Sequence, residues 1–425
     1  MTRGITADYC VTAAGVVHAP GWLVVDDDGR IAALGRGDRP QGPRWSSAPR
    51  GAAIMPAFVN AHAHLALGGA RGVADDRPFL DWIHRGLLPE LQARSTDESF
   101  FRDGARDSVR LLLSGGVATV GENFFRTDGV DALRAAGLRG VFFQEIFGSA
   151  SPDEDAHLAE IERLCDGLPA SLGDVPFGYS PHTPWTCPRR AFAKTAERAR
   201  VEGRRLSFHL AESVEEHLMF AERSGPLYEA FERQGRSARY EFGLTPTAYL
   251  ETIGALGPHA IAAHGVQLTS DDVLLLARTG TSLVHCPLSN AKLAEGIAPV
   301  AALIAAGVNV ALGTDSAASN ARLDMFEEMR AALLFGRAAT RSIAPFTSRT
   351  ALAMATTRGA AALGLAGTTG DLAPGLAADY AIVDVSTTRH GPVRDVVDTL
   401  IWCAEAKDVL VVVVGGVVRY EAGAP

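Results

Sequence analysis

The pair His62 and His64, in the segment MPAFVNAHAHL, is the first feature of this chain whose residue types and spacing suit metal chemistry. An apolar run leads into the pair, which is typical of a buried strand. On an extended segment, residues i and i+2 point to the same side, so both imidazoles can bind one ion. The alternative is a chance His-X-His sequence in a polar loop.

Three further histidines each end a short apolar run. His209 ends the run in LSFHLAES, His264 that in AIAAHGVQL and His285 that in TSLVHCPLSNAKL. If these runs are parallel barrel strands, their carboxyl ends converge on one face, where such barrels place active sites. Taken alone, His264 would be interpreted as a core histidine with a satisfied hydrogen bond. We expect His285 to orient a water molecule or an oxyanion.

Two carboxylates accompany these histidines. Glu212 follows His209 by three residues, where it can carry a proton between water and substrate, or else occupy the first turn of the next helix. Asp315 follows the apolar run in VNVALGTDSAASN and can bind a metal, or else cap a helix. Cys286 precedes a proline and has no evident base, so we interpret it as structural.

Together these residues predict a site for one divalent metal ion, with His62, His64, His209, His264 and Asp315 as ligands. Imidazole nitrogens and a carboxylate suit Zn²⁺, with Fe²⁺ or Mn²⁺ as alternatives. Such an ion lowers the pKa of a water ligand to about 7, which provides a nucleophile at neutral pH. The predicted function is therefore hydrolysis.

The central part of the chain alternates apolar runs with stretches of helical period. The runs predicted as strands are Ala53–Asn60, Val117–Asn123, Gly140–Phe147, Val175–Tyr179, Arg205–Leu210, Ala260–His264, Thr281–His285 and Val308–Gly313. The main predicted helices are Asp97–Ser114, Pro188–Glu202, Ser213–Gln234, Asp271–Thr279 and Ala298–Ala306. Eight strands alternating with helices predict an α/β fold, a (β/α)8 TIM barrel.

Both ends of the chain alternate short apolar segments with Gly and Asp turns, which is typical of β-structure. We expect the two ends to pair into one small β-sandwich, because chain termini often meet in space. The predicted domains are residues 1–54 plus 372–425 for the sandwich and residues 55–371 for the barrel.

Composition excludes several classes of protein. The net charge is −9 and the Lys and Arg residues form no basic stripe, so we expect no nucleic-acid partner. The 5 cysteines include no CxxC pair, which argues against a disulfide framework and favours the cytoplasm. No apolar run is long enough to span a membrane. We expect a small-molecule substrate, and a homodimer remains possible.

Several motifs resemble the amidohydrolase superfamily over nearly the whole chain. They are PAFVNAHAHL, RGVADDRPFLDWI, SPHTPW, HLAESVEE, HGV, HCPLSNAKLAEG and LGTDS. The branch they resemble holds methylthioadenosine/S-adenosylhomocysteine deaminases, aminodeoxyfutalosine deaminases, guanine deaminases and triazine hydrolases. The resemblance implies the same barrel with a terminal β-sandwich, the five metal ligands named above, Glu212 as the proton shuttle, and His285 with Asp315 as the groups that activate water.

The resemblance also bears on the metal count and the substrate. Binuclear relatives carry a carboxylated Lys at the end of strand 4, but VPFGYSPHTP has none, which implies one metal. His182 and Trp82 match residues that contact the substrate or line its base pocket, although His182 could instead orient a loop and Trp82 belong to the core. In the S-adenosylhomocysteine group a Glu nine residues after that Trp holds the ribose; here Leu91 stands there and Glu90 is the adjacent candidate.

Three functions are compatible with these motifs. The first is hydrolytic deamination of an aminated purine or purine nucleoside such as aminodeoxyfutalosine, S-adenosylhomocysteine or methylthioadenosine. The second is hydrolysis of another heterocycle, by dechlorination or deamination of an s-triazine or by deamination of guanine. The third is a non-catalytic barrel, which the complete set of predicted ligands disfavours.

Overall fold

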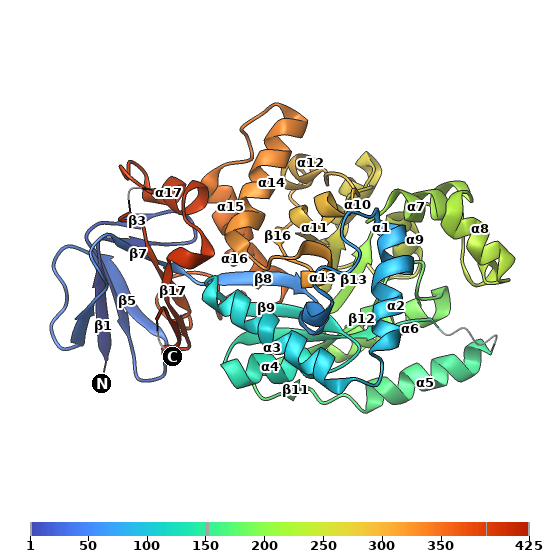
Figure 1. Ribbon diagram of the computed structural model, residues 1–425, viewed down its shortest axis with the longest axis horizontal. Coiled ribbons are helices and arrows are strands. Elements are labelled where there is room, and N and C mark those ends of the chain that lie inside the picture. Colours follow the sequence, from blue (N-terminus) through green and yellow to red (C-terminus); the bar gives the residue numbers. More distant parts are fainter. Residues whose placement is uncertain (1, 149–152, 388, 424–425) are drawn as a thin grey trace.

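Eight parallel strands form the centre of the molecule in the computed structural model, which describes residues 2–148, 153–387 and 389–423. Neighbouring strands pair in chain order, with helices between them on the outside (Figure 1). The strands are β8 (Phe58–Ala63), β9 (Val117–Phe124), β10 (Arg139–Ile146), β12 (Val175–Pro181), β13 (Leu206–Leu210), β14 (Ala260–His264), β15 (Ser282–His285) and β16 (Val310–Leu312). The predicted TIM barrel is confirmed.

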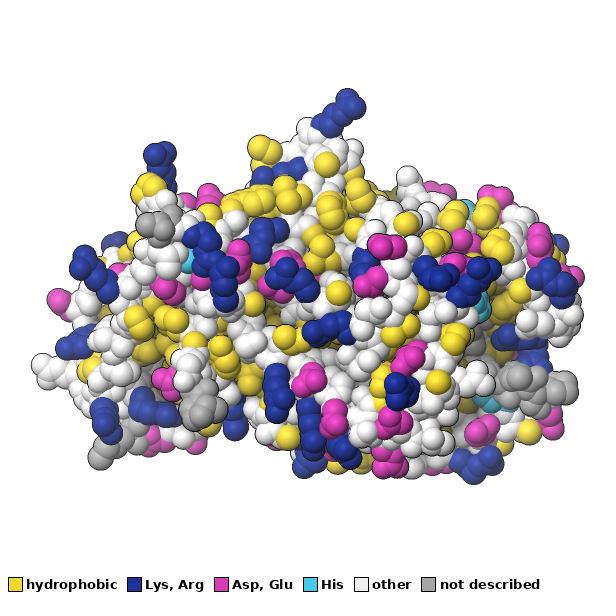
Figure 2. Space-filling view, viewed as in Figure 1, with side chains coloured by type: hydrophobic (Ala, Val, Ile, Leu, Met, Phe, Trp, Pro, Cys, Tyr) yellow, Lys and Arg dark blue, Asp and Glu magenta, His cyan; other side chains and the backbone are white. Residues whose placement is uncertain are grey.

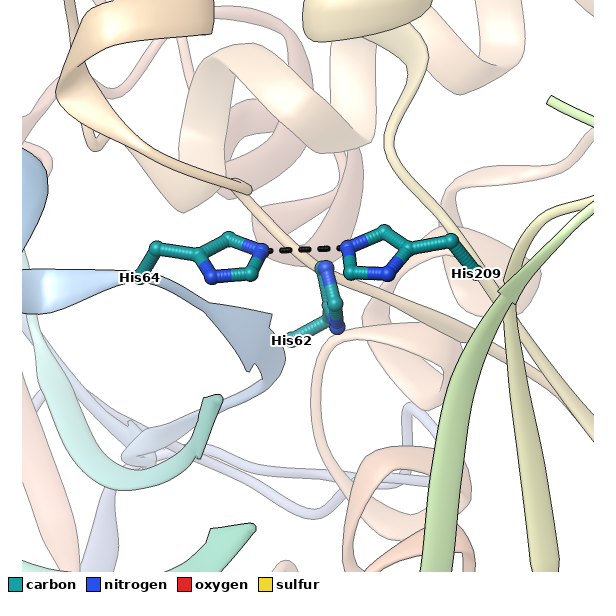
Figure 3. A group of neighbouring side chains, drawn as sticks. All are labelled: His62, His64 and His209. Atoms are coloured by element: carbon teal, nitrogen blue, oxygen red, sulfur yellow. Dashed lines mark hydrogen bonds between the residues drawn. The ribbon is translucent and has the colours of Figure 1, made fainter. Parts of the chain in front are cut away.

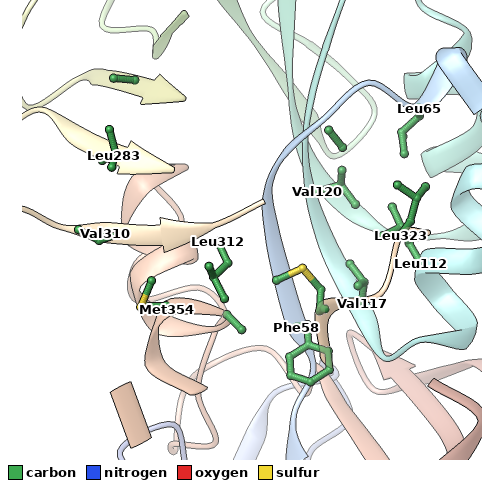
Figure 4. Packing of buried hydrophobic residues seen from close by; sticks show 14 of the residues in the cluster. Phe58, Leu65, Leu112, Val117, Val120, Leu283, Val310, Leu312, Leu323 and Met354 are labelled. Carbon is green, nitrogen blue, oxygen red and sulfur yellow. The ribbon is translucent and has the colours of Figure 1, made fainter. Parts of the chain in front are cut away.

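The barrel strands are apolar because both of their faces are buried. Val59, Val141, Ile261 and Val284 point inward and form one cluster inside the barrel. Residues of the opposite parity pack against the surrounding helices, and Figure 4 shows Phe58 and its neighbours in this outer layer. These two layers hold the strand ends in fixed positions, and the site is built on those ends.

The helices that cover the barrel follow the predicted pattern with local exceptions. The longer ones are α3 (Glu98–Ser114), α4 (Asp128–Ala136), α5 (Glu154–Asp166), α6 (Arg189–Glu202), α8 (Gly225–Arg233), α10 (Ser270–Thr279) and α14 (Met325–Thr340). The single helix predicted over Ser213–Gln234 is wrong. It is divided into α7 (Val214–His217), a π-helical turn and α8, because Arg223 adopts a left-handed φ of 53° before Gly225.

The first predicted strand, Ala53–Asn60, is divided as well. Residues Ala52–Pro56 form β7, which pairs with β17 (Tyr380–Asp384) outside the barrel, and β8 begins only at Phe58. Pro56 has no N–H to donate, which is compatible with the change of partner at this point. The run predicted as one strand therefore contributes β7 to the terminal sandwich and β8 to the barrel.

Both ends of the chain build a second, smaller domain at one side of the barrel (Figure 1). One sheet has the order β5-β4-β1-β6, and the other β19-β18-β17-β7-β2-β3. These strands are β1 (Arg3–Ala7), β2 (Tyr9–Val11), β3 (Val17–His18), β4 (Gly21–Val25), β5 (Ile31–Arg36), β6 (Arg44–Ser47), β18 (Val409–Val414) and β19 (Val417–Glu421). Leu23, Ile54 and Ile382 are buried in their common core, which confirms the sandwich made from both termini. The domain boundaries stay a prediction.

The barrel closes between its first and last strands by few backbone contacts. Ala63 and Asp315 form an isolated parallel bridge, and the Asp315 N–H donates to the His62 carbonyl at 3.1 Å. Below them, Asn60 and Thr314 exchange two hydrogen bonds of 2.7 and 3.0 Å. We call this closure the seam. Of the predicted ligands, His62 lies on one side of the seam and Asp315 on the other.

The surface in Figure 2 carries Lys and Arg side chains mixed with Asp and Glu side chains, without a continuous basic stripe on the face in view. The predicted absence of a nucleic-acid partner and the possible homodimer stay predictions. No helix in the part of the chain that the structure describes is both long and apolar enough to cross a membrane.

Candidate metal and catalytic site

Three predicted ligands meet at the carboxyl ends of β8 and β13. Ring nitrogens of His62, His64 and His209 lie within 4.8 Å of one another, and all three side chains are buried. Figure 3 shows the rings of His64 and His209 facing each other, with His62 directed between them. The Nε2 atoms of His64 and His209 are 3.2 Å apart. Two ligands of a tetrahedral zinc ion stand about 3.3 Å apart, so this spacing fits the ion.

The protonation of these rings also suits a cation. His209 Nδ1 lies 2.8 Å from the His182 carbonyl, which can only accept, so His209 carries its proton on Nδ1 and its Nε2 keeps a lone pair. The Nε2 of His62 has no hydrogen-bond partner among the described residues. Burial lowers the pKa of His62 and His209 well below the ordinary value and also lowers that of His64. Neutral imidazoles are the form that binds metal.

Asp315 reaches the same centre from the opposite side of the seam. Its Oδ1 is 3.5 Å from His64 Nε2, while its Oδ2 accepts hydrogen bonds from Ser289 and Ser319 at 2.6 and 2.7 Å. Burial opposes its ionisation, but His64, His264 and His62 together with Ser289 bring its pKa below the ordinary value. The alternative of a helix cap does not apply, since Ser316 caps the following turn.

His264 is adjacent to the trio but separate from it. Its ring stacks on that of His209 with centroids 5.4 Å apart, and it donates from Nδ1 to Asn290 Oδ1 at 2.8 Å. Its Nε2 therefore holds a lone pair and has no partner among the residues described. Both His264 and Asp315 adopt left-handed backbone, with φ of 71° and 58°. Such strain in non-glycine residues is concentrated at functional sites.

Glu212 lies beside His264, with Oε1 3.5 Å from His264 Nδ1. Its side chain is buried, and burial raises its pKa above the ordinary value, against the effect of His264. Ser213, not Glu212, caps the next helix, because the Ser213 hydroxyl accepts from the Glu216 N–H. A buried carboxyl with a raised pKa can hold a proton at neutral pH and deliver it to a substrate.

Glu145, at the end of β10, is a buried acidic group that the sequence analysis missed. Its Oε1 lies 3.6 Å from His64 Nδ1 and 3.9 Å from His182 Nε2 and makes no hydrogen bond within the described ranges. Burial raises its pKa to about 8. Its position at a strand end, one residue before Ile146, was the only signal that the sequence offered.

His285 is buried at the end of β15, but it is not among the described residues that line the cavity above the trio. Burial lowers its pKa to about 3. Its Nδ1 has no hydrogen-bond partner in the described part of the chain. The structure thus places His285 at the end of the strand next to that of His264 and outside the described lining of the cavity.

A cavity of about 260 Å³ opens directly above these groups. Its floor contains His64, His209, His264, Glu212 and Asp315, and its walls include two of the predicted substrate contacts, Trp82 and His182. Glu90 is not among the described lining residues. It pairs with Arg94 at 3.1 Å on the outer side of α2 (Leu88–Ala93), whereas Leu91 lines the cavity.

An eight-stranded parallel barrel with a histidine cluster at its strand ends defines a class of metal-dependent hydrolase. The comparison with family models agrees: residues 53–419 match the model described as the amidohydrolase family. The chain belongs to this family, as the motif resemblance predicted.

Curated relatives and a solved structure extend this result. The chain is 34% identical over 397 residues to a 5'-deoxyadenosine deaminase of Methanosarcina mazei, covering 92% of this chain and 86% of that protein. It is 34% identical over 414 residues to a 5-methylthioadenosine/S-adenosylhomocysteine deaminase of Halobacterium salinarum, covering 95% and 90%. An adenosine deaminase from Xanthomonas campestris with bound zinc superposes with a TM-score of 0.86 at 30% identity, covering 99% of this chain and 94% of that one.

Proposed function

We propose that this protein is a metal-dependent deaminase that releases ammonia from an aminated purine or purine nucleoside. The observation that carries the proposal is the convergence of three neutral imidazoles and Asp315 on one point, with the buried Glu212 carboxyl beside it. The deaminase relatives support the choice of reaction.

His62, His64, His209 and Asp315 would hold the ion, with His264 as the fifth ligand or as a direct neighbour of the reacting water. We propose zinc, because the donors are imidazoles and one carboxylate and because the Xanthomonas structure contains zinc. A divalent ion supplies Lewis-acid activation of water at neutral pH.

The remaining chemistry falls to the chain's own residues. Glu212 delivers a proton to a ring nitrogen, which makes the amino-bearing carbon more electrophilic. Asp315 accepts the proton of the attacking water, and its two serine hydrogen bonds keep the other oxygen in place. We retain His285 as a supporting residue at the neighbouring strand end. Asp315 passes the proton it has accepted to the amino group, which leaves as ammonia when its bond to the ring carbon breaks. The new hydroxyl becomes the carbonyl and returns a proton to Glu212.

The test is ammonia release by the zinc-loaded protein from a panel of purines. The panel contains 5'-deoxyadenosine, methylthioadenosine, S-adenosylhomocysteine, aminodeoxyfutalosine, adenosine and guanine. We expect deamination of at least one adenine derivative, loss of activity with a chelator, and recovery with Zn²⁺. Chloride release from a chlorinated s-triazine without any ammonia from the purines would contradict the proposal.

A matched pair of variants tests the metal centre independently of turnover. His62→Ala should lower the bound zinc, measured by elemental analysis, while His217→Ala should not, because His217 belongs to α7 and lies outside the trio. Equal zinc content in both variants would contradict the assigned ligands.

We also propose a cytoplasmic location. All five cysteines are free and four of them are buried, which is typical of a reducing compartment.

A further inference from the structure

The outer part of the cavity is lined mainly by apolar side chains among the residues that the structure describes. One wall is the segment from α1 (Phe79–Trp82) through the π-helical turn to α2, which stands beside the strand ends in Figure 1. The opposite wall follows β9 and β10. We call the outer cavity the apolar bay; its lining includes Trp82, Leu87, Leu88, Leu91, Phe125 and Phe147.

The part of the bay that is open to solvent is also lined by apolar side chains. Leu88, Phe125 and Phe147 are 49%, 44% and 37% exposed, and all three line the cavity. Exposed large apolar groups that gather around one opening are a mark of a binding site. Leu87 and Leu91 lie four residues apart on the same face of their helical segment, so the wall is a continuous surface.

Most polar groups near the bay already have partners; the exceptions close to the floor are His182 Nε2 and, 3.9 Å from it, Glu145 Oε1, which makes no hydrogen bond among the described residues. The Trp82 indole donates to the Val73 carbonyl at 3.1 Å and thus presents only its ring face or edge. The Thr183 and Thr186 hydroxyls bond each other at 2.8 Å, and Thr186 also bonds His182 Nδ1 at 2.8 Å. The Glu90 carboxylate is turned to Arg94. At the rim, His84 is an exposed polar side chain among the described lining residues and is open to a ligand.

Among the described residues, the groups open to a ligand are therefore those of the floor, Glu145 and His182 Nε2 next to it, and His84 at the rim. The amino-bearing ring must sit on the floor. A sugar hydroxyl placed against the leucine and phenylalanine side chains of the bay would lose its water partners without gaining partners from these residues, and such a loss weakens binding by about tenfold for each group. In contrast, each methylene moved into the bay from water improves binding by about fourfold.

We propose that the substrate is an aminated purine whose substituent, where it leaves the catalytic floor, is an alkyl-like apolar group and not a hydroxyl-rich or charged one. This inference rests on the proposed function and narrows its substrate class. The helix wall around Leu88 and Leu91 and the facing Phe125 and Phe147 select the substituent, while the floor selects the ring.

The experiment compares kcat/KM of the zinc-loaded full-length protein on 9-ethyladenine, 9-propyladenine, 9-butyladenine and adenosine. We expect kcat/KM to rise about fourfold with each methylene, and 9-butyladenine to exceed adenosine by at least about tenfold. A flat series, or a preference for adenosine, would overturn the inference and leave the proposed function intact.

Absence of ammonia from every member of the series and from the purine panel would overturn the proposed function. In that case, the affinities of the same compounds, measured by calorimetry, test whether the bay binds an alkyl group. Affinity that increases with chain length supports the bay, and equal affinities overturn it.

A matched pair of variants locates the effect in the bay. Leu88→Ser should lower the ratio of kcat/KM for 9-butyladenine to that for 9-ethyladenine by about fourfold or more. Leu334→Ser on α14 changes a leucine of similar exposure, 52% against 49%, that does not line the cavity. It should keep the wild-type ratio. The same ratio in all three proteins would contradict the assignment of Leu88.

Discussion

Glu212 and Asp315 are both buried carboxyl groups of one site, yet their surroundings shift their pKa values in opposite directions. Burial dominates at Glu212 and raises its pKa, whereas His64, His264 and Ser289 overcome burial at Asp315 and lower its pKa. At neutral pH one group can therefore donate a proton while the other accepts one. This difference is what an acid and a base in the same reaction require.

The acid role of Glu212 gives the prediction at the residue scale. Glu212→Gln should lower kcat by about 10²- to 10⁴-fold, because the amide cannot deliver a proton. Zinc content should not change, since Glu212 is not a proposed ligand. Glu215→Gln, at a half-buried position of the next turn, serves as the control and should keep wild-type kcat. A similar loss of kcat in both variants would contradict the assignment.

The sequence singled out the residues that the structure brings together as a candidate metal site more completely than those that line the cavity above it. His62, His64 and His209 were predictable because each follows a recognisable apolar strand, and strand ends converge in a barrel. Glu145 was missed because one acidic residue after a strand has many structural explanations. Glu90 was chosen over Leu91 by residue type, but the direction of a side chain on a short helix depends on tertiary packing, which places Leu91 in the cavity.

At the scale of elements, the segment after β13 shows how a buried group supports the active-site loop. Glu216, on α7, accepts a hydrogen bond from the Glu212 N–H at 3.0 Å and is 1% exposed. This contact explains why the sequence HLAESVEE turns sharply after the strand and why Ala211 tolerates a left-handed φ of 49°. The periodic pattern predicted one helix here because apolar spacing does not indicate a left-handed residue such as Arg223, where the helix is divided.

Glu216 should make stability depend on pH. Burial raises its pKa from 4.5 to about 8, so the folded state binds more protons than the unfolded state between these values. Its contribution to the free energy of unfolding is complete below pH 4.5 and is lost as the pH rises through about 8.

Chemical denaturation of Glu216→Gln at pH 5 to 8 tests this prediction. The variant should lose less stability than the wild type over this range, by up to about 1.4 kcal/mol for each pH unit. Glu229→Gln is the control, because its side chain is 68% exposed in the folded protein. A slope in Glu216→Gln equal to that of the wild type would refute the prediction.

At the scale of the whole molecule, Asp379 joins the barrel to the sandwich. Its carboxylate, which is 1% exposed, accepts from Arg139 at the start of β10 at 2.7 Å and from the Gly415 N–H in the turn between β18 and β19 at 2.6 Å. Thr369 adds a third hydrogen bond at 2.7 Å. Apolar patterning predicted both domains, but this junction depends on single polar residues far apart in the chain.

Asp379→Ala should lower the free energy of unfolding by about 3 kcal/mol, because it leaves Arg139 without its buried partner. Asp384→Ala, at the other end of β17, removes mainly local bonds to Ser386 and should cost about 1 kcal/mol. Thermal and denaturant unfolding measure both values. A loss at Asp379 no larger than that at Asp384 would show that the junction contributes little.

The seam between Ala63 and Asp315 has a consequence for synthesis on the ribosome. The strand that bears His62 and His64 emerges early, but its partner across the seam emerges only after most of the chain has been made, and β7 must wait still longer for β17. Until then these segments present unpaired backbone edges, which favour aggregation. A nascent chain halted before residue 380 would hold every proposed ligand and yet leave the edge of β7 open, so this protein should depend on chaperones most in the last stage of its translation.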